Sequence, residues 1–491
     1  MLKHLPVLLT VMPLAGAFLV PVFGRSGRGH RMALVTVAVT LLAAVTMLGI
    51  TAGGEVLRYR VGDWPPPWGI ELRVDALGAL LASFFALVYL AVTIFAGRDI
   101  PGELNPASVH WYWSLLLLLL AGINGVVTAH DLFNLFVFTE VFSLAACGII
   151  SIRDRLDSLE AAIKYLILSA VAAGCILLGI ALVYMVTGHL NLSYLAAELP
   201  MAARLYPKNV LAMVALLTTG FALKSALFPL HVWLPDAHSS APSPSSALLS
   251  GLVVKVGIVA LIRLFTTVFT GPVIAALPVP VFMIVMAVGG IIFGALFAMT
   301  QRDLKRMLAY STVTQVGYIY LGFGLLNETA LTGALLHIIN HALLKSMLFM
   351  CAGLFIHRTG KRRIADMAGL ARHMPLTMSC FTIGAMAMVG IPVTNGFVSK
   401  WHLVLGTLHG GQPLLAGVIL LSSLLSSIYY FPVVVAGWFG HPASPPPPGP
   451  EGPPSMVWPI VALASLCLIL GVWPHLPLRL LGDVARTLLG R

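Results

Sequence analysis

The chain has 491 residues, of which 59% are hydrophobic and only 10% are charged. This composition excludes a soluble globular domain and predicts an all-α polytopic membrane protein. The formal net charge of +11 is attributed to lysine and arginine in membrane loops. The lipid bilayer is therefore an expected partner, and nucleic acid is not.

Apolar runs bounded by charge, proline or glycine predict fourteen transmembrane helices of about 20 residues each. They cover residues 5–23, 32–52, 74–96, 111–129, 131–150, 160–187, 209–228, 244–269, 279–299, 307–326, 330–356, 375–408 with a break, 411–438 and 457–473. A cleaved signal peptide is an alternative for residues 1–23, which a first span explains equally well.

An even number of spans places both termini on one side of the membrane. Lysines and arginines flanking the spans number fourteen on the opposite side, including Arg153, Lys305 and Arg362, and ten on the side of the termini, including Arg263. Because cytoplasmic loops carry the excess of basic residues, both termini are expected outside the cytoplasm of the plasma membrane.

Two interrupted apolar runs indicate an internal repeat. Pro229 and Pro235 interrupt the run that carries Lys224, and Gly390 and Pro392 interrupt the run that carries Lys400. Such paired segments are typical of transporters built from inverted repeats. The sequence therefore predicts two inverted five-helix half-channels, each with a broken helix, at residues 111–270 and 271–440; residues 1–110 hold three N-terminal spans, and residues 441–491 hold a proline-rich loop, the last span and a tail.

Five lysines fall inside predicted spans: Lys164, Lys224, Lys255, Lys345 and Lys400. A charge at bilayer depth costs about 2.5 to 3.5 kcal/mol, so it normally faces a bundle interior or a water-filled cavity. Burial disfavours the charged form of a lysine and a nearby carboxylate favours it, which suits proton transfer. Lys164 follows Glu160 near the start of a span and is expected only to extend towards the surface.

Among the acidic residues, Glu140 alone lies deep in an apolar run, FNLFVFTEVFSLAACGII. Our hypothesis is that Glu140 pairs with Lys224 in one state and releases it in another, which would change the proton affinity of the amine. The alternative is a static ion pair that fixes helix packing.

The run LLHIINHALLKSMLF places His337, His341 and Lys345 on one helical face, and histidine can relay protons near neutral pH. The alternatives are histidines held by interhelical hydrogen bonds, a metal site or a haem site. No metal or cofactor is expected, because an H-E-x-x-H motif is absent and the five cysteines stand singly. His231 and His238 flank HVWLPDAH and are expected either to admit protons or to hydrogen-bond freed carbonyls.

Five sequence blocks in order carry a family resemblance. They are DLFNLFVFTE ending at Glu140, KSALFPLHVWLPDAHSSAPSPSSALLSGLVVKVG from Lys224, RDLKRMLAYSTVTQVGY from Arg302, HIINHALLKSMLF from His337 and GIPVTNGFVSKW ending at Trp401. Through them, residues 74–438 resemble the antiporter-like family shared by the membrane arm of respiratory complex I, Mrp-type multisubunit Na+/H+ antiporters and membrane-bound hydrogenases.

The resemblance implies roles for the buried residues. Glu140 and Lys224 would form the ion-pair switch of the first half-channel, Lys255 and the histidine span would link the halves, and Lys400 would be the central lysine of the second. DLFNLFVF resembles the D-type subunit of Mrp antiporters or its hydrogenase counterpart, and Lys400 argues against the M type of complex I subunits. Thr139 departs from the family, since many relatives carry an aromatic residue there.

The expected function is therefore an ion-translocating subunit that moves H+, with coupling to Na+ left open, in a complex with other membrane subunits. One alternative is a proton-pumping subunit of a redox-driven complex, either NADH-quinone oxidoreductase or a membrane-bound hydrogenase, with no redox centre of its own. A second alternative is a non-conducting scaffold, which the buried lysines disfavour.

Two expectations concern geometry. Lys255, His337, His341 and Lys400 come from separate spans and are expected along one hydrated line near mid-membrane. The second half has no equivalent of Glu140, because adding the repeat offset to position 140 reaches residues 308–316, which contain no acid. Lys400 is therefore expected to lack a carboxylate partner.

Overall fold

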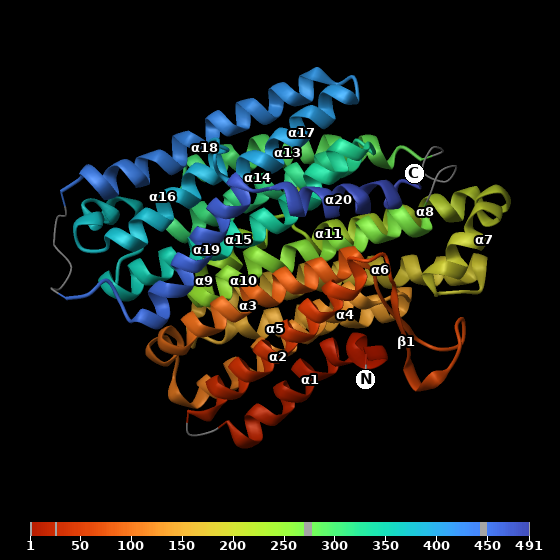
Figure 1. Cartoon of the computed structure of the whole chain (residues 1–491), viewed down its shortest axis with the longest axis horizontal. Helices are drawn as coiled ribbons and strands as arrows, with labels where there is room; N and C mark the ends of the chain where they lie inside the picture. Colours follow the sequence, from red (N-terminus) through yellow and green to blue (C-terminus); the bar gives the residue numbers. More distant parts are fainter. Residues whose placement is uncertain (1, 25–26, 270–276, 442–448, 491) are drawn as a thin grey trace.

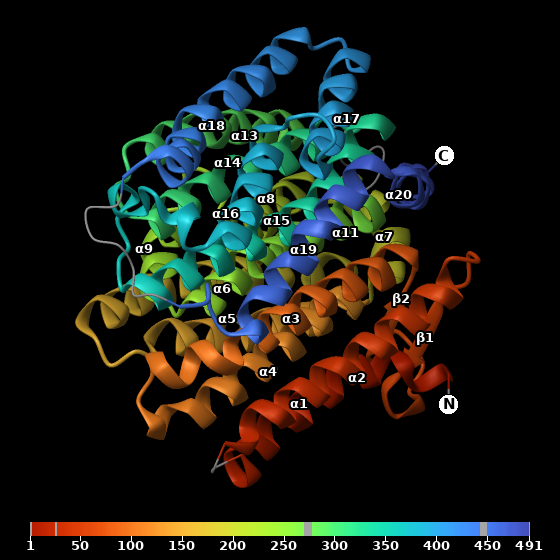
Figure 2. The same ribbon diagram turned by 60° about the vertical axis from the view of Figure 1, so that its left-hand side comes forward.

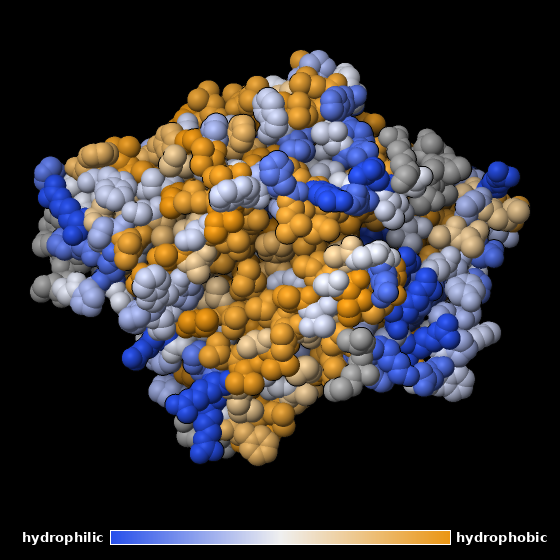
Figure 3. Space-filling view, viewed as in Figure 1, coloured by the Kyte–Doolittle hydropathy of each residue, from blue (hydrophilic) through white to orange (hydrophobic). Residues whose placement is uncertain are grey.

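The structure, a computed structural model, describes residues 2–24, 27–269, 277–441 and 449–490. Most of this part of the chain is helical, and eleven of its helices are long and apolar enough to cross a membrane. Figure 3 shows a broad apolar belt between two hydrophilic ends. This arrangement is that of an all-α polytopic membrane protein, in which helices satisfy their own backbone groups inside the lipid.

Two N-terminal helices, α1 (Leu5–Phe23) and α2 (Arg28–Thr51), pack side by side at one edge of the bundle (Figures 1 and 2). The third, α3 (Ala76–Glu103), packs against α2 and lies farther inside the bundle. Between α2 and α3 the chain forms an antiparallel hairpin of β1 (Leu57–Arg60) and β2 (Glu71–Val74). Asp75 then caps α3, since its side chain accepts a hydrogen bond from the Gly78 N–H at 2.8 Å.

The first predicted half-channel begins with three long helices, α4 (Pro106–Thr128), α5 (Leu132–Ser151) and α6 (Leu156–Thr187). A shorter α7 (Leu192–Leu205) leads into α8 (Pro207–Lys224). Lys224 is the last residue of α8, whereas the sequence predicted a position inside a longer span, 209–228. The helix ends there because Ala226 adopts a left-handed conformation, with φ of 54°.

A segmented helix follows this break. After the short α9 (Leu234–Ser240), the chain runs through α10 (Ser243–Leu248), a π-helical turn η3 (Leu249–Val253), α11 (Val254–Arg263) and a second π-helical turn η4 (Leu264–Val268). Together α10 to η4 form one of the eleven apolar spans, and its most apolar part is wholly buried. π-Helical turns often occur at functional sites, and η3 directly precedes Lys255.

The second predicted half-channel contains α13 (Val279–Met299), α14 (Leu304–Gly324), α15 (Glu328–Thr359), α16 (Pro375–Val389), α17 (Asn395–His409) and α18 (Pro413–Phe439). Short 3₁₀ turns are η1 (Leu2–His4), η2 (Val61–Asp63), η5 (Ile364–Met367) and η6 (Leu370–Arg372). The predicted break in residues 375–408 is confirmed between α16 and α17. Gly390 sits at this break with φ of 94°, a conformation that glycine adopts without strain.

Helix α15 lies at the centre of the fold. Its most apolar part is completely buried, and it packs against α3, α10, α14, α16 and α17. The last helices, α19 (Pro454–Val472) and α20 (His475–Leu488), also pack against α15 and α3. Residues on α15 can therefore contact both halves of the molecule.

The eleven apolar helices correspond to eleven of the fourteen predicted spans. The other three predicted spans are α8, α14 and the divided pair α16 and α17. α8 and the pair α16 and α17 end at helix breaks, which shorten these helices. Polar side chains that face the bundle interior lower the mean hydropathy of α14.

Candidate functional site

Glu140 and Lys224 form an ion pair between α5 and α8. The Lys224 ammonium lies 2.9 Å from Glu140 Oε1 and also donates to Ser143 Oγ at 2.8 Å and Ser169 Oγ at 2.6 Å. Ser143 is on the same face of α5 as Glu140, three residues later, and Ser169 comes from α6. These acceptors use all three N–H bonds of the ammonium. The predicted pairing is thus present in this conformation.

Lys255 is fully buried near the middle of its apolar span. Its ammonium donates a short hydrogen bond to the Ser250 carbonyl in the η3 turn. The Ser250 hydroxyl in turn hydrogen-bonds Thr312 Oγ1 on α14 at 2.7 Å. Lys255 therefore stands at the boundary between the two halves, held by a backbone carbonyl of the π-helical turn.

The rings of His337 and His341 are parallel on adjacent turns of α15, with centroids 5.9 Å apart. His337 Nδ1 lies 2.9 Å from Ser399 Oγ of α17, and its Nε2 lies 3.0 Å from Gln315 Oε1 of α14. This matches the alternative in which a histidine is held by interhelical hydrogen bonds.

His341 differs from His337. Its ring is buried, and neither ring nitrogen has a hydrogen-bond partner in the part of the chain that the structure describes. Leaving a buried polar group unpaired costs about 1 to 3 kcal/mol, so such a group requires an explanation. No three His, Cys, Asp or Glu side chains within the described ranges are placed to hold a metal ion.

Lys345 continues the polar face of α15 towards α14. It donates to the Leu308 carbonyl at 2.7 Å, forms a shorter hydrogen bond with Ser311 Oγ and lies 3.4 Å from the Tyr430 hydroxyl. These oxygens satisfy the ammonium without an acidic residue. The predicted face of His337, His341 and Lys345 therefore points into the bundle.

Lys400 reaches from α17 into the break that follows α16. Its ammonium donates to the carbonyls of Met388 at 2.6 Å and Val389 at 3.2 Å, and lies 4.8 Å from the centre of the Tyr318 ring. Helix C-terminal carbonyls and aromatic faces both carry partial negative charge. With Ser423 Oγ at 3.4 Å, these groups and no carboxylate surround the Lys400 ammonium among the described residues.

The structure brings the central residues together in the bundle interior. The exposed fractions are 0% for Lys255 and His341, 1% for His337 and 4% for Lys400. His341 lies within electrostatic range of Lys255, Lys345 and Lys400. His337 lies within the same range of Lys255 and Lys400. None of these side chains faces lipid.

Comparison with known proteins identifies the family. The family described as NADH:quinone oxidoreductase/Mrp antiporter, TM, matches residues 129–426, which include every residue of the site described above except Tyr430. The chain belongs to this family. It is an antiporter-like, ion-translocating membrane subunit.

Three relatives illustrate the range of this antiporter-like family. The chain is 42% identical to NADH-quinone oxidoreductase subunit N of Desulforudis audaxviator, with 96% of each chain covered. It is 31% identical to the D-type subunit of the Na(+)/H(+) antiporter of Alkalihalophilus pseudofirmus, covering 89% of this chain and 86% of the relative. The solved structure of the membrane-bound sulfane sulfur reductase, an archaeal respiratory membrane complex, contains a chain that matches with a TM-score of 0.92 and 30% identity, covering 99% and 98%.

One lysine of this antiporter-like subunit lies as the sequence predicted and another does not. Lys164, counted inside a span, has a side chain that is 48% exposed and pairs with Glu160 at 2.7 Å, so its expected extension towards the surface is confirmed. Lys305, counted as a loop residue, is 1% exposed and donates to the Ala241 carbonyl at 2.6 Å. The reason is that α14 begins at Leu304, before the predicted 307, so Lys305 packs inside its first turn.

Arg263 was also counted as a loop residue, but it is buried at the end of α11. Its guanidinium forms two hydrogen bonds of 2.8 Å with the Asp75 carboxylate. Burial raises the pKa of Asp75, but the adjacent Arg263 outweighs burial and holds that pKa below its ordinary range. This pair joins the N-terminal part of α3 to the first half-channel.

The linker histidines of the antiporter-like subunit have different surroundings. His231 stacks on Phe228 with centroids 5.3 Å apart, and its Nδ1 has no hydrogen-bond partner among the described residues. His238 is fully buried, and neither of its ring nitrogens is paired within the described part of the chain.

Sequence reasoning missed the hydroxyl partners of the buried lysines. Ser143 and Ser169 around Lys224, and Ser311 and Tyr430 around Lys345, were not predicted. The spacing of three residues between Glu140 and Ser143 was the one available signal, because it places both side chains on one helical face.

Proposed function

We propose that this subunit translocates protons along a buried path that runs from Glu140 and Lys224 through Lys255 and His341 to Lys400. The observation that carries the proposal is the Glu140–Lys224 ion pair, in which a nearly enclosed ammonium faces a carboxylate at 2.9 Å. Membership of the ion-translocating family supports the same function.

The first step is a change in the Glu140–Lys224 pair. While Glu140 is close, the buried ammonium of Lys224 is compensated and retains its proton. When the carboxylate moves away, the ammonium becomes an uncompensated buried charge and the neutral amine is favoured. The side chain of Glu140 is 28% exposed and that of Lys224 is 2% exposed, so Glu140 is the partner with room to move.

The exposure of the Glu140 side chain also supports a contact between this residue and a neighbouring membrane protein. A carboxylate deep in an apolar helix normally faces protein or a water-filled cavity, and rarely lipid. The matched relatives are named as subunits, and the matched solved chain belongs to a respiratory membrane complex. We infer that another membrane subunit shields Glu140 in the assembled complex.

The next step transfers the proton between the halves. Lys255 is placed for this role because it is buried, lies at the boundary with α14 and is bonded by a backbone carbonyl in place of an acid. His341 lies within electrostatic range of Lys255 and Lys400 and has unpaired ring nitrogens. A neutral imidazole has one donor and one acceptor nitrogen, so His341 can accept and pass on a proton.

Lys400 is the proposed terminal group of the second half-channel. Its ammonium rests on the last carbonyls of α16, just as Lys224 ends α8 beside a helix break. This similarity supports two inverted five-helix units at residues 111–270 and 271–440 within a protein of fourteen spans. In the bundle, α1 begins and α20 ends towards the same end, which supports termini on one side (Figures 1 and 2). The excess of basic residues in the opposite loops supports an orientation with the termini outside the cytoplasm of the plasma membrane.

A second candidate function is proton pumping driven by a redox partner. It is favoured by the 42% identity to an NADH-quinone oxidoreductase subunit N over 96% of the chain, compared with 31% to a D-type antiporter subunit. Everted vesicles distinguish the two functions. If the complex is a Na+/H+ antiporter, adding Na+ to vesicles that hold an imposed pH gradient should discharge that gradient. If the complex is a redox pump, only the addition of an electron donor should build a pH gradient.

The proposal of conduction is tested by Lys224→Ala in the assembled complex, with Lys208→Ala as a matched control. Lys208 is an exposed residue of the same helix, near its other end. Proton flux in vesicles should be lost in Lys224→Ala and retained in Lys208→Ala, with equal amounts of complex on a native gel. Normal flux in Lys224→Ala would favour the scaffold function.

A further inference from the structure

A basic cavity of about 620 Å³ opens at one end of the bundle, away from the proposed proton path. The turn between α3 and α4, the turn between α5 and α6, the first turn of α14 and the end of α15 with the residues after it form its walls. These segments lie on the side that the distribution of loop lysines and arginines assigns to the cytoplasm.

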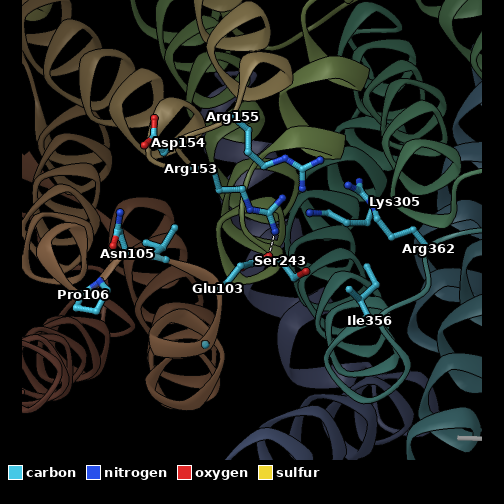
Figure 4. Close-up of a pocket in the computed structure, with 13 residues that line it drawn as sticks. Glu103, Asn105, Pro106, Arg153, Asp154, Arg155, Ser243, Lys305, Ile356 and Arg362 are labelled. Atoms are coloured by element: carbon cyan, nitrogen blue, oxygen red, sulfur yellow. Dashed lines mark ion pairs between the residues drawn. The ribbon is translucent and has the colours of Figure 1, made fainter.

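The charges around the cavity are unbalanced. Four cationic side chains and two carboxylates line it; they are Arg153, Arg155, Lys305 and Arg362 against Glu103 and Asp154. Behind this lining, Asp303 pairs with Arg362 at 3.2 Å. Figure 4 shows the nitrogen ends of the four cations converging, with the Asp154 carboxylate on the opposite side and Glu103 bonded to Arg153. Burial and the positive charges of Arg362 and Arg155 lower the pKa of Arg153 to about 10.

Lys305 is the cation with the least compensation. Its side chain is 1% exposed, and its ammonium donates to the neutral Ala241 carbonyl at 2.6 Å. Arg155 bonds Asp157 through Nε at 3.2 Å, which leaves its terminal nitrogens directed at the cavity (Figure 4). The helices α4, α6 and α14 begin around the cavity, and helix N-termini attract anions.

A second cavity of about 510 Å³ meets the first at Pro106, which lines both. Its walls are mainly apolar and come from Gly24, Gly27 and Gly29, the end of α3 and the start of α4, with Pro101, Val109 and Trp113 among them. A cationic cavity next to an apolar one matches the shape of an amphiphile with an anionic head and hydrocarbon tails.

We propose that the two cavities together bind an anionic phospholipid, with its phosphate on Lys305 and Arg155 and its acyl chains along Val109 and Trp113. Basic pockets between transmembrane helices on the cytoplasmic side are suited to such head groups. The four converging cationic side chains suit the two phosphates of cardiolipin, and the apolar cavity distinguishes a lipid from a free phosphate ion. A bound lipid would tie the α3–α4 turn of the N-terminal part to α14 of the second half.

Native mass spectrometry of the full chain in its membrane complex tests this proposal after mild delipidation. The complex is titrated with cardiolipin, phosphatidylglycerol, phosphatidylcholine and inorganic phosphate. We expect cardiolipin to bind at least about tenfold more tightly than phosphatidylcholine, and inorganic phosphate not to displace it at equal concentration. Arg155→Gln should weaken cardiolipin binding about fivefold and Lys305→Gln about tenfold.

Two further variants control the test. Arg372→Gln removes an exposed arginine of the same side that lines neither cavity, and binding should stay within about twofold of wild type. Ala107→Glu places a charge in the apolar cavity and should weaken lipid binding while leaving binding of glycerol phosphate unchanged. Because Arg155 is largely exposed, Arg155→Gln remains informative if Lys305→Gln fails to assemble.

Three results would overturn the proposal. Equal affinity for phosphatidylcholine would remove the charge requirement. Displacement of cardiolipin by equimolar inorganic phosphate would indicate a free-anion site. Lipid binding that appears only after neighbouring subunits are stripped away would assign the cavity to a partner protein.

Discussion

Removal of the Glu140 carboxylate tests the proposed switch at its one acidic group. Glu140→Gln retains an oxygen that can accept from Lys224 and removes only the charge, whereas Glu140→Ala removes both. Glu140→Asp keeps the charge but shortens the side chain by one carbon, about 1.5 Å. We expect both neutral variants to lose proton flux while the complex still assembles, and the aspartate variant to keep about a tenth of it.

The expected size of the loss follows from the geometry. Lys224 is nearly enclosed, and its carboxylate lies 2.9 Å away. Loss of a facing carboxylate changes the proton affinity of a neighbouring base by about 10- to 1,000-fold. Taking the middle of that range, because Glu140 is 28% exposed, we expect flux to fall about 100-fold.

The assay is the decay of an acid-interior gradient in everted vesicles, followed with a pH-sensitive dye, with the amount of complex taken from a native gel. Ser143 and Ser169 remain in all three variants, so the hydroxyl partners of Lys224 are unchanged. Wild-type flux in Glu140→Gln and Glu140→Ala, at equal amounts of complex, would refute the switch and leave the static ion pair.

Lys400→Arg should abolish proton flux with assembly preserved, because an arginine cannot release its proton near neutral pH; near-normal flux would remove Lys400 from the path. Ser169→Ala removes one of three hydrogen bonds to the ammonium of Lys224 and should lower flux about tenfold, and an unchanged rate would show that the hydroxyl is dispensable. Asp75→Asn leaves the buried Arg263 unpaired and should lower the free energy of unfolding by about 3 kcal/mol, seen as a lower unfolding temperature of the complex. The pKa of Asp75 is held below its ordinary value near 3.9, so the difference in free energy of unfolding between wild type and Asp75→Asn should be constant from pH 8 to 5 and shrink only in stronger acid. A difference in free energy that vanishes near pH 6 would contradict this assignment.

Hydropathy alone predicted most of the fold, because the bilayer requires long apolar helices of similar length. The predicted span 279–299 coincides with α13, and the predicted break next to Lys400 is present. The position of Lys224 at a helix end was not predictable, since the left-handed conformation of Ala226 has no signal in an apolar run.

The site could be predicted where residue types are rare at bilayer depth. A single acid among buried bases leaves few pairings, so Glu140 with Lys224 followed from composition and depth. Serine is common in transmembrane helices, and most serines bond their own backbone, so Ser169 could not be distinguished in advance. Lys305 appeared to be a loop residue in the sequence. The first turn of α14, which carries it, is buried only because it packs against the end of α9.

Proton flux through Lys255→Met tests the central claim most directly, because Lys255 joins the two halves and has no acidic partner among the described residues. Methionine fills a similar volume in the buried site and cannot carry a proton. Lys164→Met, at an exposed side chain of α6, is the matched control. If the path is continuous, Lys255→Met should assemble normally and its proton flux should fall at least about 100-fold, while Lys164→Met keeps the wild-type flux. Flux within about twofold of wild type in Lys255→Met would contradict a path between the two halves.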